Sequence, residues 1–282
     1  MNNFDIFRYK NAGMTNLGVN KLIKFYAHYE KKIGLRQLAQ VAGVKSIPDF
    51  IERYKTQDVL ELKTQFQRFP NFSIFDDNYP SRLREIYNPP TLLFYQGNLD
   101  LLKKPKLAFV GSRDTTAAGI AAVKKLIKEL DNQFVIVSGL ARGIDAASHI
   151  ATIKNYGETI AVIGTGLDVH YPSENRALQD YITEKQLILT EYAPGEKALK
   201  YHFPERNRII AGLARGVVVT EAKLRSGSLI TAERAMEEGR DVFAVPGNIA
   251  DGMSDGCNAL IQQGAKLVFT GHDILEEYLS YV

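Results

Sequence analysis

The chain has 282 residues, 45% of them hydrophobic and 24% charged, and its formal net charge is +3. This is the composition of a folded globular protein with a sizeable core, in one large domain or two smaller ones. A net charge this small does not indicate a nucleic-acid partner, so only a local basic cluster would point to one.

Compartment and membrane signals are absent from the sequence. The first residues, MNNFDIFRYK, are polar and charged where a secretory signal needs an apolar core. No apolar run reaches the roughly 18 residues of a membrane span. The only cysteine, Cys257, excludes an intrachain disulfide and argues against a cysteine metal site. We therefore expect a cytoplasmic protein with no membrane partner.

Residues 1–66 have a helical pattern and no strand-like runs. Apolar residues recur at helical spacing in Asn20–Tyr29 and Gly34–Gly43, and a further helix is expected from Asp49 to about Lys63. Short helices separated by glycine and proline indicate a small all-α bundle. The AQVAGV turn favours a helix-hairpin-helix or sterile-alpha-motif (SAM)-like unit, and a packing module without DNA contact is its simplest interpretation.

Residues 67–104 form a transition in which four prolines exclude long helices. A strand is expected at Thr91–Gln96, with a turn at Gly97-Asn98.

From Lys106 onward, short apolar runs alternate with helical stretches, which is typical of a doubly wound α/β domain with a mostly parallel sheet. The expected strands are Leu107–Val110, Phe134–Val137, Ile160–Ile163, Leu187–Leu189, Val217–Thr220 and Val242–Val245. The expected helices are about Thr116–Leu130, Ile144–Asn155, Glu174–Thr183 and Leu229–Glu238, with a final helix from His272.

Small and polar residues follow each strand, at the edge where parallel sheets bind ligands. The first such segment, Gly111-Ser112-Arg113, permits a sharp turn and offers the amides of the next helix to an anion. Neither this segment nor Gly164–Val169 has the GxGxxG spacing, so no dinucleotide cofactor is expected. Arg113 either meets the anion or pairs with an acid such as Asp145.

The second edge loop, SGLARGID at 138–145, has Gly139 and Gly143 on either side of Arg142. Arg142 is either a phosphate ligand or a surface charge. Asp145 is expected to cap the helix that follows. Beyond the third strand, His170 has no metal-ligand partner at useful spacing, so we expect it to be polar packing or surface.

The densest cluster is HFPERNRIIAG at 202–212, preceded by Lys197 and Lys200. Pro204 is expected to open a helix at its first position. Arginine and asparagine at a helix start favour phosphate binding. The alternative is an internal salt-bridge network that uses one or both arginines, with Glu191, Glu205 and Glu221 as partners.

Ser226-Gly227-Ser228 begins another helix, whose hydroxyls and amides suit a single phosphate. The P-loop spacing is absent, and GMSDG at 252–256 lacks the strand that a nucleophile elbow requires. HExxH and Cys/His clusters are also absent, so no metal or catalytic site is expected. Cations with an aromatic residue, Phe203, favour single-stranded nucleic acid.

These motifs resemble those of the DprA/Smf family of bacterial DNA-processing proteins. The shared segments are GSR at 111–113, SGLARGID at 138–145, TIAVIGTGLDVHYP at 159–172, FPERNRIIAG at 203–212, EAKLRSGSLITAERAMEEGRDVFAVPG at 221–247 and DGCNALIQQGAKLV at 255–268. The likeness runs from about Phe69 to the C-terminus, with a looser match in the helical N-terminal part.

The resemblance implies a SAM-like domain over residues 1–66 and an extended Rossmann-like domain over 67–282. It implies a homodimer that binds single-stranded DNA without catalysis, protects incoming DNA in natural transformation and loads the RecA recombinase onto it. The implied DNA-binding residues are Gly111, Ser112, Arg113, Gly139, Arg142, Arg176, Lys200, Phe203, Arg206, Asn207, Arg208, Ser226, Gly227 and Ser228. The implied dimer residues are Met236, Asn258, Leu260, Ile261, Leu267 and Phe269.

Two departures from the family pattern stand out. Ser173 occupies a position where relatives can carry a basic residue, and the winged-helix module found at the C-terminus of many relatives is not expected here. Two other functions stay open on sequence grounds. One is a nucleotide or nucleoside-phosphate hydrolase that uses Ser226-Gly227-Ser228 near Glu221, and the other is an adaptor that contacts the recombinase but not DNA.

Overall fold

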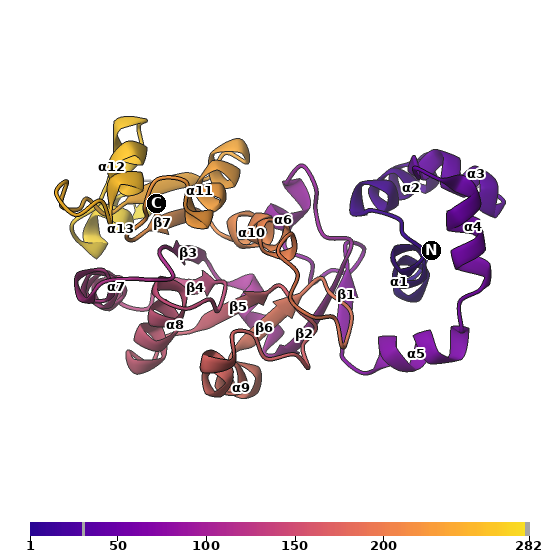
Figure 1. Cartoon of the computed structure of the whole chain (residues 1–282), viewed down its shortest axis with the longest axis horizontal. Coiled ribbons are helices and arrows are strands. Elements are labelled where there is room, and N and C mark those ends of the chain that lie inside the picture. Colours follow the sequence, from indigo (N-terminus) through magenta and orange to yellow (C-terminus); the bar gives the residue numbers. More distant parts are fainter. Residues whose placement is uncertain (30–31, 280–282) are drawn as a thin grey trace. The chain divides into compact units, whose positions relative to one another are not determined.

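The computed structural model describes residues 1–29 and 32–279, in two compact units, Met1–Phe94 and Tyr95–Val282 (Figure 1). The first unit is mainly helical. Its helices are α1 (Asn3–Asn11), α2 (Asn16–His28), α3 (Leu35–Ala42), α4 (Ile47–Lys55), α5 (Val59–Gln67) and the short α6 (Ser81–Glu85).

The helix expected from Asp49 to Lys63 is wrong, because two helices occupy that stretch. The α4 helix ends at Lys55, and Asp58 then accepts hydrogen bonds from the amides of Leu60 and Glu61. A side chain that satisfies the first free amides starts a new helix at that point, and it is α5.

Two strands of the first unit form an antiparallel pair. The sequence did not predict β1 (Asn71–Ser73), whereas β2 (Leu92–Gly97) matches the expected strand. Asn71 to Ser73 pair with Phe94 to Leu92. The end of β2 crosses into the second unit.

The second unit contains a parallel sheet in the order β6-β5-β4-β3-β7-β8-β9. Its strands are β3 (Lys106–Val110), β4 (Val135–Ser138), β5 (Thr159–Ile163), β6 (Leu187–Thr190), β7 (Gly216–Val219), β8 (Asp241–Ala244) and β9 (Lys266–Leu267). All but β9 match expected strands to within one residue at each end. These runs form strands because they are apolar and buried on both faces.

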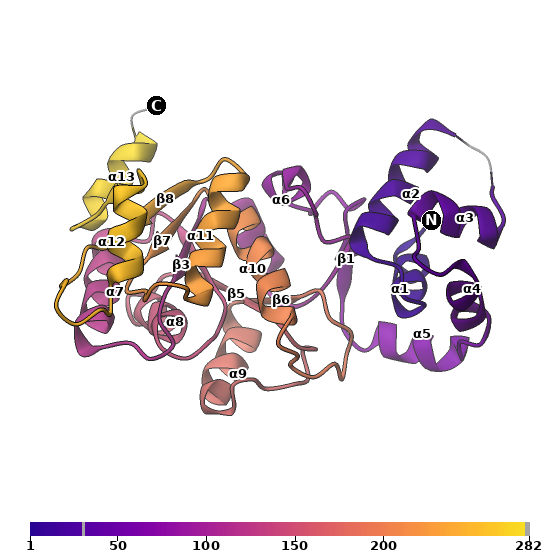
Figure 2. The ribbon, with the colours of Figure 1, turned by 45° about the horizontal axis from the view of Figure 1, so that its top comes forward.

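Helices alternate with these strands and cover both faces of the sheet (Figures 1 and 2). The α7 helix packs against α8 and α13, and α10 packs against α11 on the other side. The helices are α7 (Ala117–Glu129), α8 (Ile144–Lys154), α9 (Arg176–Lys185), α10 (His202–Leu213), α11 (Gly227–Glu237), α12 (Asp255–Gln262) and α13 (Gly271–Leu279). The predicted doubly wound α/β fold is confirmed.

The strand order reverses beside β3. The chain builds β4, β5 and β6 on one side of β3 and then returns to place β7 on its other side. Ala108 of β3 lies opposite Val137 of β4 and Val217 of β7. The loops after β3 and β7 therefore leave toward opposite faces, and a crevice is expected between them. Among the described residues, no helix is both long and apolar enough to cross a bilayer.

His149 of α8 is completely buried in this unit. Its Nδ1 lies 2.6 Å from the Thr159 hydroxyl, which itself lies 2.6 Å from the Ile136 carbonyl oxygen. Because that hydroxyl donates its one proton to the carbonyl, it accepts from His149, which fixes Nδ1 as the protonated nitrogen. Burial, with a smaller contribution from the Arg206 charge, lowers the pKa of His149 to about 3.

We expect this neutral histidine to make the fold sensitive to acid. The unfolded chain binds a proton below about pH 6.5 and the folded chain does not, so stability is lost as the pH falls from about 6.5 toward 3. At pH 5 the loss from this group is about 2 kcal/mol. Urea unfolding of wild type and His149→Gln at pH 7.5 and 5 measures this loss. The difference in free energy of unfolding between the two proteins should be smaller at pH 5 than at pH 7.5 by that amount. Equal differences at both pH values would contradict the prediction, and exposed His272→Gln is the control.

Candidate nucleic-acid interface

A cavity of about 670 Å³ opens where β3 and β7 end, at the reversal of the strand order. Its lining comes from the end of β3, from five loops and from the helices α8, α10 and α11. The residues are Val110, Gly111, Ser112, Arg113, Asp114, Ala141, Asp145, Tyr171, Lys200, Phe203, Pro204, Arg206, Asn207, Ile210, Lys223, Ser226, Gly227, Ser228, Ile230 and Thr231. A second cavity of about 340 Å³ shares Arg113, Ala141, Tyr171, Phe203 and Arg206 with it. Four edge motifs that are far apart in the sequence therefore meet in one place.

Arg113, Phe203 and Tyr171 form a stack at the border between the two cavities. The Arg113 guanidinium carbon lies 5.4 Å from the centroid of the Phe203 ring, and the Tyr171 ring lies 5.5 Å from the same ring. Arg113 is exposed, and no ion pair joins it to Asp145 within the described part of the chain. An open guanidinium on an aromatic face suits a site that meets both phosphates and bases.

The α10 helix presents Phe203 to this stack. It begins at His202, so Pro204 is its third residue and not its first. Proline is tolerated there because none of the first four amides has a partner within the helix. His202 is buried, with Nδ1 3.0 Å from the Gly164 carbonyl oxygen. This contact fixes the start of α10 against the end of β5.

Arg208 does not face the cavities. The residue is 7% exposed, and its guanidinium donates to Glu191 and lies 3.4 Å from a carboxylate oxygen of Glu205. The internal salt-bridge alternative is correct for this arginine, with Glu191 and Glu205 as partners but not Glu221. The expectation that Arg208 itself contacts DNA is therefore not supported by its position.

Arg206 is also buried, at 3% exposure, but it lies beneath both cavities. Its Nη1 donates to the Val162 carbonyl oxygen at 2.9 Å. A Cβ atom added to Gly139 would lie 1.5 Å from that nitrogen, so the glycine is what makes room for the guanidinium. Burial lowers the pKa of Arg206, and the Asp145 charge opposes this shift. Arg206 therefore places a positive charge beneath the cavity floor, but its guanidinium is not exposed in the cavity.

Asp145 is buried beside Arg206, and the expectation that it caps α8 is wrong. The cap position is Gly143, and the Asp145 carboxylate accepts from the Gly139 amide at 3.1 Å in the preceding loop. Burial raises the pKa of Asp145, whereas the Arg206 charge and the loop amides lower it. Asp145 therefore holds the loop at Gly139, which packs against the Arg206 guanidinium.

The loop after β7 supplies the opposite wall. The α11 helix begins at Gly227 as expected, and the Ser226 and Ser228 hydroxyls lie 2.7 Å apart. The Asn207 side-chain Nδ2 donates to the Gly227 carbonyl oxygen at 3.4 Å, which brings this part of α10 to the same helix start. Exposed Lys200 and Lys223 complete this wall.

Some predicted site residues lie farther from this centre. Arg142 lines the second cavity, 3.9 Å from a Glu174 oxygen. Arg176 lies 3.9 Å from Asp180 and lines neither of these cavities. His170, which was expected to be polar packing or surface, pairs with Asp180 at 2.7 Å and also lines the second cavity. Sequence reasoning missed Lys223 and Tyr171 as site residues, although Lys223 follows the fifth strand end and Tyr171 belongs to the TGLDVHYP segment.

Comparison with known proteins shows the family of the chain. Residues 71–279 match the family model described as DNA recombination-mediator protein A, and residues 1–62 match the DNA processing protein A sterile alpha motif domain. The chain belongs to the DNA recombination-mediator protein A (DprA) family. The predicted family and SAM-like N-terminal domain are thus confirmed.

Individual DprA proteins support this membership over nearly the whole chain. The chain is 57% identical to DNA processing protein DprA of Streptococcus pneumoniae over 276 residues, 98% of each chain, and its structure matches the X-ray structure of that protein with a TM-score of 0.96. It is 49% identical to the Bacillus subtilis DprA over 72% of this chain and 69% of the relative.

The chain is also similar to a more distant DprA structure. The Helicobacter pylori protein, described for its unique single-stranded DNA binding mode, has 30% identity and a TM-score of 0.67 over 76% of this chain and 97% of its own.

The residues proposed for a DprA dimer are not equally available at the surface. Leu260 is 5% exposed and belongs to the core of the chain itself, and the Asn258 side chain holds the Gly247 backbone at 3.1 and 3.2 Å. Met236 and Phe269 are 44% and 64% exposed. The structure thus separates core positions from surface positions, which the sequence pattern did not.

Proposed function

We propose that this chain binds single-stranded DNA in the cavity after β3 and β7 and loads the RecA recombinase onto it, as a non-enzymatic mediator in the cytoplasm. The observation that carries the proposal is the stack of Arg113, Phe203 and Tyr171 between two cavities, with Lys200 and Lys223 beside it. Rings stack on bases and cations follow the phosphates, which is how proteins hold single strands.

Within this proposal the site residues have different tasks. Arg113, Lys200, Phe203, Asn207 and the start of α11 at Gly227 contact the strand. Arg206 adds charge from below, with Gly139 making room for it, and Arg208 holds α10 in place through its carboxylate partners.

The same proposal includes a homodimer, and it now omits Leu260. Met236 and Phe269 offer exposed apolar surface, and Ile261 and Leu267 are half-buried. The recombinase as partner rests on the family's description as a recombination mediator.

The hydrolase alternative needs an available carboxylate near Ser226-Gly227-Ser228. Glu221 is 6% exposed, and its carboxylate accepts from the Thr116 amide and hydroxyl. A carboxylate held in this way is not placed to activate water in the cavity. Its position favours binding over hydrolysis.

Fluorescence anisotropy with labelled oligothymidine and with a labelled duplex tests the proposal. We expect the single strand to bind at least about tenfold more tightly, because a duplex keeps its bases stacked on each other and offers none to Phe203. Phe203→Leu keeps the apolar packing and should weaken binding of the single strand by about 1–3 kcal/mol, with little effect on the duplex. Equal affinity of the wild type for the two DNAs would overturn the proposal.

A further inference from the structure

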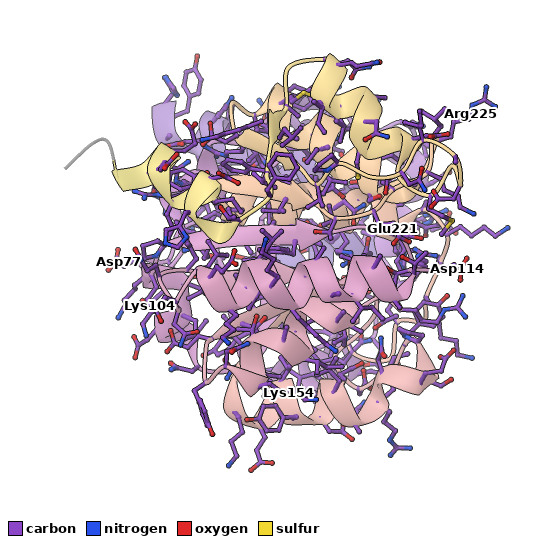
Figure 3. All side chains as sticks on the ribbon, turned by 90° about the vertical axis from the view of Figure 1, so that its left-hand side faces the viewer. Asp77, Lys104, Asp114, Lys154, Glu221 and Arg225 are labelled. Atoms are coloured by element: carbon purple, nitrogen blue, oxygen red, sulfur yellow. The ribbon has the colours of Figure 1, made fainter. Side chains whose placement is uncertain are left out.

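Glu221 is an unexpected residue beside a site for a polyanion. It follows β7 closely, it is 6% exposed, and its φ of 71° is one that side-chain-bearing residues rarely adopt. Residues held in such backbone conformations often mark functional sites. In Figure 3 it is labelled at the same end of the molecule as Asp114, which precedes α7.

The Glu221 carboxylate sits on the N-terminus of α7. Its two oxygens lie 3.0 and 3.2 Å from the Thr116 amide, and one of them accepts from the Thr116 hydroxyl at 2.6 Å. The same hydroxyl accepts from the Gly119 amide at 3.1 Å. A Cβ on Gly119 would lie 2.3 Å from the carboxylate, so α7 has a glycine where Glu221 packs.

This contact corrects one expectation from the sequence. The amides at the start of α7 were expected to meet an anionic ligand, as helix N-termini do in nucleotide-binding sheets. The anion found there is the chain's own carboxylate, which also satisfies the positive end of the helix dipole. The start of α11 at Gly227, in contrast, lines the cavity itself.

Glu221 also holds the loop that carries Arg113. Its carbonyl oxygen accepts from the Ser112 amide at 2.7 Å, so the loop is attached to Glu221 at Ser112 and again at Thr116. Arg113 lies between these two attachments. The chain after Glu221 leads to Lys223 and Ser226 on the opposite wall, which makes this one residue a link between both walls of the cavity.

We propose that Glu221 is an internal anion that occupies the phosphate position at the start of α7 and thereby positions Arg113 for single-stranded DNA. The inference rests on the proposed function. Glu221 itself does not touch the DNA, so it is a positioning residue that acts through Ser112, Arg113 and Thr116.

The decisive variant is Glu221→Gly, because glycine keeps the positive φ and removes only the side chain. Loss of a carboxylate near a polyanion site should strengthen binding if charge alone mattered. We expect the opposite, about a tenfold rise in Kd for oligothymidine. Asp114→Asn is the matched control, since this exposed carboxylate lines the same cavity and its loss should lower Kd.

Two further comparisons show whether the effect passes through Arg113. In an Arg113→Ala background, Glu221→Gly should change Kd by less than about twofold, because coupled residues are not additive. Glu221→Gln keeps one acceptor for Thr116 and should fall between wild type and glycine, even if the glycine variant is less stable. A rise in Kd that is equally large without Arg113 would overturn the positioning role, as would an unchanged Kd in the glycine variant.

A measurement without DNA separates this inference from the proposed function. Amide exchange at Thr116 and Gly119 should be faster in Glu221→Gly, and acetate that replaces chloride at constant ionic strength should slow it again by filling the vacated anion position. Exchange that is unchanged by the variant would overturn the internal-anion role whether or not the wild type binds DNA. Wild type that fails to bind oligothymidine would refute the proposed function alone.

Discussion

The double variant Arg113→Ala with Lys200→Ala is expected to lose about 3 kcal/mol of binding free energy for single-stranded DNA, roughly a hundredfold in Kd. Both cations are exposed and line the large cavity, Arg113 from the loop after β3 and Lys200 from the loop before α10. Neither forms an ion pair within the residues that the structure describes, so no carboxylate competes with DNA for them. Anisotropy with oligothymidine measures the loss.

The salt dependence of binding gives a second readout of the same variant. Each phosphate contact to a single strand contributes about 0.7 to the slope of log K against log salt, so two lost contacts should reduce the slope by about 1.4. The control pair is Lys128→Ala with Lys154→Ala, which removes the same charge. These exposed lysines lie at the C-terminal ends of α7 and α8, at the sheet edge opposite the cavity. Equal losses in both pairs would mean that general charge, and not the cavity, binds the strand.

The edge of the sheet that carries the site was predictable from the sequence. Parallel strands buried on both faces read as continuous apolar runs, and the polar residues that follow them must meet at one edge. Gly111–Arg113, Phe203 and Ser226–Ser228 were placed correctly on this basis, because each follows a strand or begins a helix at that edge.

The sequence offered an internal salt-bridge network for the two arginines of the RNR motif but could not decide between burial and contact with a ligand. A helix start rich in donors looks the same in sequence whether its side chains meet a ligand or the protein's own oxygens. Arg206 turns inward because its guanidinium donates to the Val162 carbonyl oxygen and fits in the space that Gly139 leaves. Arg208 turns inward because its guanidinium donates to the Glu191 carboxylate. These partners lie 17 to 67 residues away from the arginines in the chain. Residue spacing within the motif carries no information about them.

Glu221 illustrates the same limit from the other direction. In sequence it was a candidate partner for the arginines, as an acid that follows a strand. In the fold its carboxylate is used by Thr116, because the loops after β3 and β7 are neighbours at the reversal of the strand order. Strand order decides which loops are adjacent, and it was not available from the alternation of strands and helices alone.

Substituting Gly139 by alanine should destabilise the fold by about 3–5 kcal/mol, the cost of breaking a buried charge interaction. The backbone at Gly139 is not in the left-handed region, so the cost comes from contact and not from backbone conformation. The new Cβ would lie 1.5 Å from Arg206 Nη1 and would displace the guanidinium from the Val162 carbonyl. The charge would then remain buried without that hydrogen bond. The buried Asp145 carboxyl, whose pKa the Arg206 charge lowers, would be affected as well.

Urea unfolding of Gly139→Ala measures the cost, with Gly227→Ala as the control because a Cβ there meets nothing within 4 Å. The control should change stability by less than about 1 kcal/mol. Arg206→Met removes the guanidinium that the new Cβ would contact. The double variant with Gly139→Ala should therefore lose at least about 2 kcal/mol less free energy of unfolding than the sum of the two single losses. Additive costs would show that Gly139 is needed for some reason other than Arg206, and a loss below about 1 kcal/mol in Gly139→Ala would show that the guanidinium can lie elsewhere.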